Sequence, residues 1–205
     1  MTRILGRDAA SISEVAAIVR RGGLVAFPTD TVYGLGCDPW NSQAIDRLFE
    51  SKGREAKPIP VLCAGIEQAE SLVALDGLAL ELARRFWPGA LTIVAPLKRP
   101  VPLRLDQGTG WLGVRVPDHE VPRALAQEAG GSITGTSANL SGQPSSRTAG
   151  EVERSMGDLL DAVIDGGRTD GTESTIVKVV RGSVEVLRRG AIGIDSGITR
   201  ESFNR

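Results

Sequence analysis

The chain is poor in the residue types on which many common protein sites depend. Its 205 residues include two cysteines, one histidine, one tyrosine, three tryptophans and four phenylalanines. Cys37 and Cys63 are too far apart for a CxxC pair, and neither an HExxH motif nor paired carboxylates at metal-ligand spacing occurs. We therefore predict no metal held by the protein itself. With so few aromatic residues, the core must be built mainly from Val, Ile, Leu and Ala.

The chain also carries almost no net charge and has no long apolar run. The formal net charge is -1, which argues against nucleic-acid binding driven by the charge of the whole molecule. No apolar run approaches the roughly 18 residues of a membrane span, and the first six residues lack the apolar core of a signal peptide. Together with the two widely separated cysteines, this predicts a cytoplasmic protein without a membrane partner.

Apolar runs that read as strands alternate with helical patterns. Helix caps are expected at Ser11 or Ser13, at Asn41 or Ser42, and at Thr148. The strands are expected at 24–27, 59–64, 91–95, 111–116, 132–136, 162–165, 175–180 and 184–187. The last two read as a hairpin because only 181–183 joins them. We predict an α/β fold with a mixed, twisted sheet, in one domain over 1–192 followed by a polar, loosely held tail over 193–205.

Familiar nucleotide and hydrolase motifs do not fit. The letters GTGWLG at 108–113 match GxGxxG, but the dinucleotide fingerprint needs a strand before it and a helix after it, and here a strand follows. No GxxxxGK[ST] phosphate loop occurs. Ser137 lacks the final glycine of a nucleophile elbow, and the lone His119 reads as a turn residue. A nucleotide would therefore have to be bound by residues outside these motifs.

The stretch 22–36 organises the candidate site. An apolar run leads to Pro28, which ends regular strand pairing, and two threonines, Asp30, Tyr33 and two glycines follow in a turn. Taken alone, this would read as an ordinary connection. Three further polar loops follow strand-like runs, and they carry Ser137, Asn139 and Ser174. This repetition favours one shared site.

Cations gather at two kinds of position. Lys52, Arg54 and Lys57 surround a predicted helix C-terminus, where the helix dipole alone would explain the first two. Arg115 and Arg188 end apolar strands, where a charge is costly unless it meets an anion. Because guanidinium groups bind carboxylate and phosphate in a bidentate manner, this pattern favours a polyanionic ligand.

Several motifs stand together in one order: FPTDTVYGL at 27–35, KGR at 52–54, FWPG at 86–89, GVRVPDH at 113–119, TSANLSG at 136–142 and ESTIV at 173–177. In this order they resemble the YrdC/TsaC family of L-threonylcarbamoyladenylate synthases in its short, single-domain form, over about residues 10 to 192. A later LRRG at 187–190 resembles the closing LRPG of the family, with Arg189 where proline is usual. The loop after Arg54 is one residue shorter than the family pattern, which leaves Lys57 without a role carried over.

The resemblance implies a fold and a reaction. The fold would be a YrdC-like twisted mixed β-sheet with flanking helices around a central concave basic cavity. The reaction would join L-threonine, bicarbonate or CO2, and ATP into threonylcarbamoyl-AMP with release of pyrophosphate, for N6-threonylcarbamoyladenosine modification of tRNA next to the anticodon. Mg2+ would accompany ATP through its phosphates. Partners would include downstream threonylcarbamoyl-transfer enzymes and, through weak contact, tRNA itself.

The resemblance also implies site residues. Lys52, Arg54, Ser137 and Asn139 would form the catalytic set. The residues implied at ATP are Lys52, Arg54, Asn139, Ser145 and Arg188, and those implied at threonine are Thr31, Arg115, Ser137 and Ser174. Arg115 would pair with the threonine carboxylate.

Two alternatives remain open at this point. A YrdC-like module could bind RNA without catalysis, although the near-zero net charge and the scarcity of stacking aromatics weaken that reading. A paralogue with the same fold could act on another carbamoylated substrate.

Overall fold

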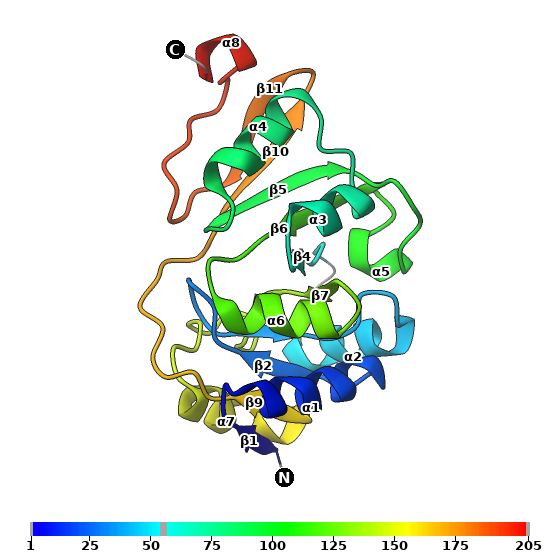
Figure 1. The fold of residues 1–205 in the computed structure, drawn as a ribbon, viewed down its shortest axis with the longest axis vertical. Helices are drawn as coiled ribbons and strands as arrows, with labels where there is room; N and C mark the ends of the chain where they lie inside the picture. The colour runs from blue at the N-terminus through cyan, green and yellow to red at the C-terminus, as the bar shows by residue number, and fades with distance from the viewer. Residues whose placement is uncertain (1, 54–56, 204–205) are drawn as a thin grey trace.

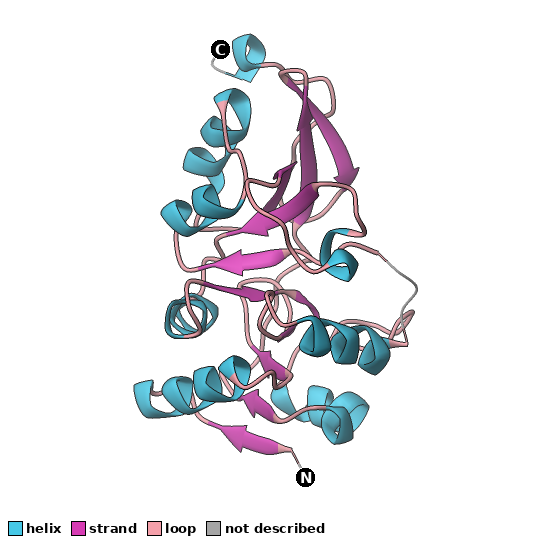
Figure 2. Ribbon diagram, turned by 90° about the vertical axis from the view of Figure 1, so that its right-hand side faces the viewer, coloured by secondary structure: helices cyan, strands magenta, loops and turns pink. Residues whose placement is uncertain are grey.

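The computed structural model describes residues 2–53 and 57–203, which form two mixed β-sheets with helices around them. One sheet has the strand order β1-β9-β2-β3-β8 and the other β11-β10-β5-β6-β4-β7. Figure 1 shows the sheets arranged along the long axis of the molecule, with α6 at the level where they meet. Figure 2 shows helices on both sides of the strands. The predicted mixed α/β fold is confirmed, with two sheets in place of one.

The elements have the following bounds. The first sheet contains β1 (Arg3–Leu5), β2 (Val25–Phe27), β3 (Gly34–Gly36), β8 (Thr136–Ser137) and β9 (Ala162–Ile164). The second contains β4 (Val61–Cys63), β5 (Leu91–Pro96), β6 (Trp111–Arg115), β7 (Ser132–Thr134), β10 (Thr175–Val180) and β11 (Ser183–Arg188). The helices are α1 (Ala9–Arg20), α2 (Ser42–Lys52), α3 (Ile66–Leu72), α4 (Gly77–Phe86), α5 (Leu103–Asp106), α6 (Glu120–Glu128), α7 (Ala149–Met156), the 3-10 turn η1 (Gly157–Leu159) and α8 (Arg200–Phe203).

The segment 132–137 joins the two sheets. The sequence predicts one strand here, but the chain changes sheets at Gly135: β7 pairs with β4, and β8 pairs with β3. A Cβ on Gly135 would lie 2.8 Å from Leu62 Cδ1, so only glycine lets the chain pass this closely. Thr134 N donates to Cys37 O at 3.0 Å and ties the end of β7 to the residue after β3. Backbone contacts therefore fix the place where the two sheets meet at Gly135, which is called the seam below.

Helix caps decide where several helices begin. α1 is capped by Asp8, whose Oδ1 accepts from Ser11 N at 3.1 Å, so the prediction of a serine cap is wrong. Asn41 caps α2 and Thr148 caps α7, as predicted. His119 caps α6, where its Nδ1 accepts from Val121 N at 3.2 Å, which confirms its structural reading.

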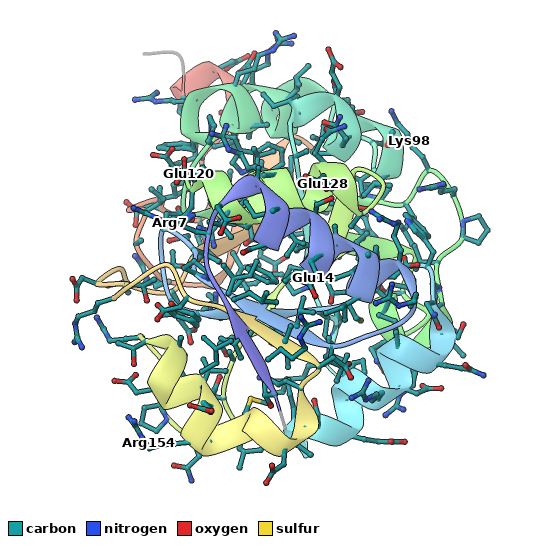
Figure 3. The ribbon with its side chains drawn as sticks, turned by 60° about the horizontal axis from the view of Figure 1, so that its bottom comes forward. Arg7, Glu14, Lys98, Glu120, Glu128 and Arg154 are labelled. Carbon is teal, nitrogen blue, oxygen red and sulfur yellow. The ribbon has the colours of Figure 1, made fainter. Side chains whose placement is uncertain are left out.

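Apolar packing holds α1, α6 and both sheets together. Val15 and Val19 of α1 and Val121 and Leu125 of α6 are fully buried in one cluster that also contains Leu62 of β4. Figure 3 shows α1 in front of α6, whose two ends are marked by Glu120 and Glu128. Because this cluster includes residues of both sheets, helix packing supports the seam from outside.

The end of the described chain contacts other elements of the fold. Ile194 is buried, and Val184 N donates to Ile198 O at 2.9 Å. The ring of Phe203 in α8 lies 6.3 Å from that of Phe86 in α4. These contacts connect 193–203 to α4 and β11, while the domain boundary at 192 and the loosely held tail stay predictions. No helix in the described ranges is long and apolar enough to cross a membrane.

Candidate functional site

A cavity of about 150 Å³ opens at the seam between the sheets. Both sides of Gly135 contribute to it, since Leu62 of β4 and Ser137 of β8 are among its lining residues. The polar lining consists of Thr29, Thr31, Thr92, Arg115, Thr136, Ser137, Glu173, Ser174 and Arg188. Val32, Pro58, Pro60, Leu62 and Ile176 supply apolar surface. The predicted convergence of distant loops is thus present in the structure.

The predicted site residues fall into three groups. Those implied at threonine, together with Arg188, line the cavity directly: Thr31, Arg115, Ser137, Ser174 and Arg188. Lys52, Asn139 and Ser145 lie behind this lining and reach it through hydrogen bonds. Arg54 lies outside the described residues.

The turn after β2 presents the hydroxyl of Thr31. Thr29 Oγ1 accepts from Thr31 N at 3.0 Å, lies 2.9 Å from Thr31 Oγ1 and donates to Val32 O at 2.7 Å. Such local bonds are typical of Ser/Thr turns. Gly171 packs against this turn, because a Cβ there would lie 2.7 Å from Thr31 Cα. Sequence reasoning missed Thr29 as a site residue, although the Thr-x-Thr spacing was a visible signal.

Arg115 is held by three partners at the end of β6. Its Nε donates to Gly89 O at 2.8 Å, its Nη1 donates to Thr31 Oγ1 at 3.3 Å, and its Nη2 forms an ion pair with Asp30. The residue is only 5% exposed. Burial lowers the pKa of Arg115 below its ordinary value, and the Asp30 carboxylate opposes that shift. The ion pair is what makes a cation tolerable at this depth.

Lys52 supports the wall that carries Ser137. It is the last residue of α2, and Gly53 ends the helix in the left-handed conformation with φ 57°. The buried Lys52 Nζ donates to Ser137 O at 2.5 Å and to Asn139 O at 2.9 Å. Asn139 Nδ2 donates to Leu140 O and Gln143 O, while its Oδ1 is buried without a hydrogen-bond partner among the described residues. Lys52 and Asn139 therefore shape the backbone around Ser137.

The opposite wall is a chain of polar contacts. Ser174 Oγ lies 3.0 Å from Thr92 Oγ1, and Arg188 Nη2 donates to Ser174 O at 2.8 Å. Glu173 Oε1 accepts from Ser145 Oγ at 2.8 Å, and its Oε2 pairs with Arg188 Nη1 at 2.8 Å. Thr92 and Glu173 were not predicted as site residues. Glu173 stood next to Ser174 in the ESTIV motif, but its partners cannot be read from that position.

Both arginines of the described lining are paired with carboxylates. Arg115 is paired with Asp30, and Arg188 is paired with Glu173. The basic character predicted for the cavity is therefore not shown by this part of the chain and stays a prediction, since Arg54 is outside it. No group of three or more His, Cys, Asp or Glu side chains that could hold a metal occurs among the described residues.

The fold and the cavity together define an α/β protein with a polar cavity between two mixed sheets. The family model Sua5/YciO/YrdC, described as "Telomere recombination", matches residues 17–190. The chain belongs to this family.

Two of the relatives that it resembles are named threonylcarbamoyl-AMP synthase. It is 39% identical over 183 residues to the threonylcarbamoyl-AMP synthase of Pyrococcus abyssi, covering 88% of this chain and 54% of that protein. It is 39% identical over 208 residues to the threonylcarbamoyl-AMP synthase of Bacillus subtilis, covering 99% of this chain and 58% of the relative. The crystal structure of P. abyssi Sua5 complexed with L-threonine superposes with a TM-score of 0.87 at 37% identity, over 93% of this chain and 57% of that one. The chain thus spans little more than half the length of these proteins.

Proposed function

We propose that this chain is a threonylcarbamoyl-AMP synthase. In the proposed reaction, the amine of L-threonine captures CO2 or bicarbonate as a carbamate. A carbamate oxygen then attacks the α-phosphate of ATP, a new P–O bond forms, and pyrophosphate leaves. The product would supply the threonylcarbamoyl group for threonylcarbamoyladenosine in tRNA, with release of AMP, through downstream transfer enzymes in the cytoplasm. Support comes from the family membership and from the names of the relatives.

The observation that carries the proposal is the orientation of Arg115. A guanidinium has five N–H groups, and hydrogen bonds to described residues use one on Nε, one on Nη1 and one on Nη2. One N–H therefore remains on each terminal nitrogen for a ligand. Since Arg115 lines the cavity beside Thr31, a bidentate carboxylate with a neighbouring hydroxyl contact would fit. An amino acid offers this combination.

Little covalent chemistry falls to the protein in this reaction. The carbamate and the α-phosphate are both anionic, so they must be desolvated, aligned and neutralised. Arg188 lines the cavity as a candidate partner for the nucleotide phosphates. Lys52, Asn139 and Ser145 would contribute from the supporting wall, and Arg54, outside the described residues, is proposed at the phosphates by its place in the KGR motif.

Mg2+ is proposed to enter with ATP. The described residues contain no cluster of three potential metal ligands, so they do not form a protein cage for the ion. Mg2+ commonly keeps several waters and binds through substrate phosphates. Its contribution when bound would be to neutralise phosphate charge, while the chain's own residues hold and orient the two substrates.

The direct test is to mix the purified chain with ATP, L-threonine and bicarbonate and to look for threonylcarbamoyl-AMP by mass spectrometry, with pyrophosphate release measured in parallel. Arg115→Gln should abolish product formation. Arg104→Gln is the matched control, because it removes the same charge from a surface arginine that pairs with Asp46 outside the cavity. Absence of the product with the unchanged chain would overturn the proposal, and full activity of Arg115→Gln would remove its structural basis.

A further inference from the structure

Glu173 is a carboxylate in the wall of a cavity that is proposed to bind anions. Its two oxygens are occupied by different donors: Oε1 accepts from Ser145 Oγ and Oε2 pairs with Arg188 Nη1, each at 2.8 Å. These donors come from separate segments of the chain, and both are proposed to contact ATP. The two donors therefore converge on a single anion, and in this structure that anion belongs to the protein.

Arg188 does not depend on Glu173 for its orientation. Its Nε donates to Ser174 O at 3.2 Å, and its Nη2 donates to Ser174 O at 2.8 Å and to Ser174 Oγ at 3.1 Å. Ser174 is buried and in turn contacts Thr92 Oγ1. One edge of the guanidinium is thus fixed to a buried residue, and only Nη1 faces Glu173.

Ser145 is also held independently of Glu173. The next residue, Ser146, is buried; its Oγ donates to Ala138 O at 2.6 Å and its O accepts from Tyr33 N at 3.0 Å. These bonds attach the backbone of the loop to Ala138 and Tyr33. If the Glu173 carboxylate moved away, the Arg188 guanidinium and the backbone beside Ser145 would keep these attachments, and the Ser145 hydroxyl would be left to donate to another acceptor.

The contact between Glu173 and Arg188 is weak enough to be exchanged. Their side chains are 41% and 43% exposed, and ion pairs at such exposure contribute little because water screens them. A phosphate group carries more charge and more acceptor oxygens than a carboxylate, and guanidinium binds it well. A nucleotide phosphate would therefore compete successfully for Nη1 of Arg188.

We propose that Glu173 is an internal competitor for the phosphate that Arg188 and Ser145 are proposed to bind. The inference rests on the proposed function for the identity of the ligand. Glu173 occupies the two donors when phosphate is absent, and phosphate binding displaces its carboxylate. Removing that carboxylate should consequently tighten phosphate binding, whereas loss of a positioning or ligand-binding residue would weaken it.

The test is calorimetric titration of the full chain and of Glu173→Gln with Mg-ATP, AMP and pyrophosphate, without threonine or bicarbonate. The expected result is a dissociation constant about two- to fivefold lower for the variant, the factor that corresponds to an exposed ion pair. A gain with AMP would place the competition at the α-phosphate, and a gain with pyrophosphate alone would place it at the outer phosphates. An unchanged or higher dissociation constant for all three ligands would overturn the proposal.

Two further variants distinguish competition by Glu173 from a general effect of removing one negative charge. Asp195→Asn removes one negative charge and an ion pair with Arg189 on the adjacent segment, and it should leave all three affinities unchanged. In the Arg188→Gln background, Glu173→Gln should give a smaller gain, because Ser145 Oγ is then the one donor of the proposed pair that Glu173 still contests. An undiminished gain there, or an equal gain in Asp195→Asn, would show long-range electrostatics and refute the competition. These measurements do not need turnover, so they succeed or fail separately from product formation.

Discussion

Asp30 and Arg115 form the most buried ion pair among the described residues, with side chains that are 15% and 6% exposed. The carboxylate sits on the turn after β2 and the guanidinium at the end of β6. The pair therefore links the two sheets directly beside the cavity. Because the pair is buried, its loss is expected to lower the stability of the protein.

Removing the Asp30 carboxylate should destabilise the protein. Asp30→Ala leaves the buried Arg115 cation without its partner, which typically costs about 3 kcal/mol or more. Asp30→Asn keeps a hydrogen-bond acceptor and should cost less. Urea unfolding measures both free energies. As a control, Asp46→Asn breaks an exposed pair with Arg104 and should change the free energy of unfolding by less than about 1 kcal/mol. Equal effects at the two sites would contradict the structural role assigned to Asp30.

The hydroxyl of Thr31 should matter for threonine affinity. Thr31→Val keeps the shape of the side chain but removes the oxygen that contacts Thr29 Oγ1 and Arg115 Nη1. Loss of the hydrogen bond proposed between this hydroxyl and threonine costs about 1 kcal/mol, so the dissociation constant for threonine should rise about fivefold. Thr31→Ser keeps the hydroxyl and should bind within about twofold of the unchanged chain. Titration calorimetry with threonine gives both values, and a Thr31→Val variant that binds normally would exclude this contact.

Gly171 should not tolerate even a methyl group. A Cβ there would lie 2.7 Å from Thr31 Cα and 2.8 Å from Thr31 O, which are backbone atoms that cannot rotate away. Gly171→Ala should destabilise the protein by about 1–3 kcal/mol and raise the KM for threonine by displacing Thr31. Gly193→Ala is the matched control, since a Cβ there meets nothing within 4 Å. The comparison needs thermal unfolding and steady-state kinetics of both variants, and equal behaviour would refute the close approach.

The two cysteines should make stability fall in mild alkali. Burial raises the pKa of Cys37 and of Cys63 from 9.0 to about 12. Above pH 9 the unfolded chain loses these protons while the folded chain keeps them, so the free energy of unfolding decreases as pH rises from about 9 toward 12. The slope approaches about 1.4 kcal/mol per pH unit for each thiol.

Urea unfolding between about pH 8.5 and pH 9.8 measures this slope, and most of that window lies below the ordinary tyrosine pKa. The Cys37→Ala, Cys63→Ala double variant should show a flatter dependence than the unchanged chain. Native thiols should also resist alkylation near pH 8 and react once the chain is unfolded. Rapid alkylation of the folded protein would contradict the burial of both thiols.

Several predicted site residues that differ from their sequence neighbours do line the cavity, while their roles stay predictions. Arg115 and Arg188 end apolar strands, and Thr31, Ser137 and Ser174 lie on polar loops beside strands, so each stood out against its neighbours. The hairpin of β10 and β11 was found for the same reason, because a three-residue connection between two apolar runs leaves few alternatives.

Features that depend on distant partners were not predicted. The Glu173 carboxylate accepts a hydrogen bond from Ser145, which is 28 residues away in the sequence. No residue near Glu173 in the sequence indicates that contact. The cap of α1 was misplaced because the apolar periodicity begins at Ile12, later than the helix itself. The docking of 193–203 depends on Ile194 and Phe203, two isolated apolar residues whose partners lie on other elements.

The change of sheet at Gly135 has a consequence for how much the family fold can vary at this point. Side chains alternate along a strand with a period of two, so one inserted residue between Thr134 and Thr136 would turn Ser137 to the opposite face of its sheet. The same insertion would push Lys52 off the carbonyl that it now holds. The length of this short crossing is therefore constrained as tightly as the glycine at its centre.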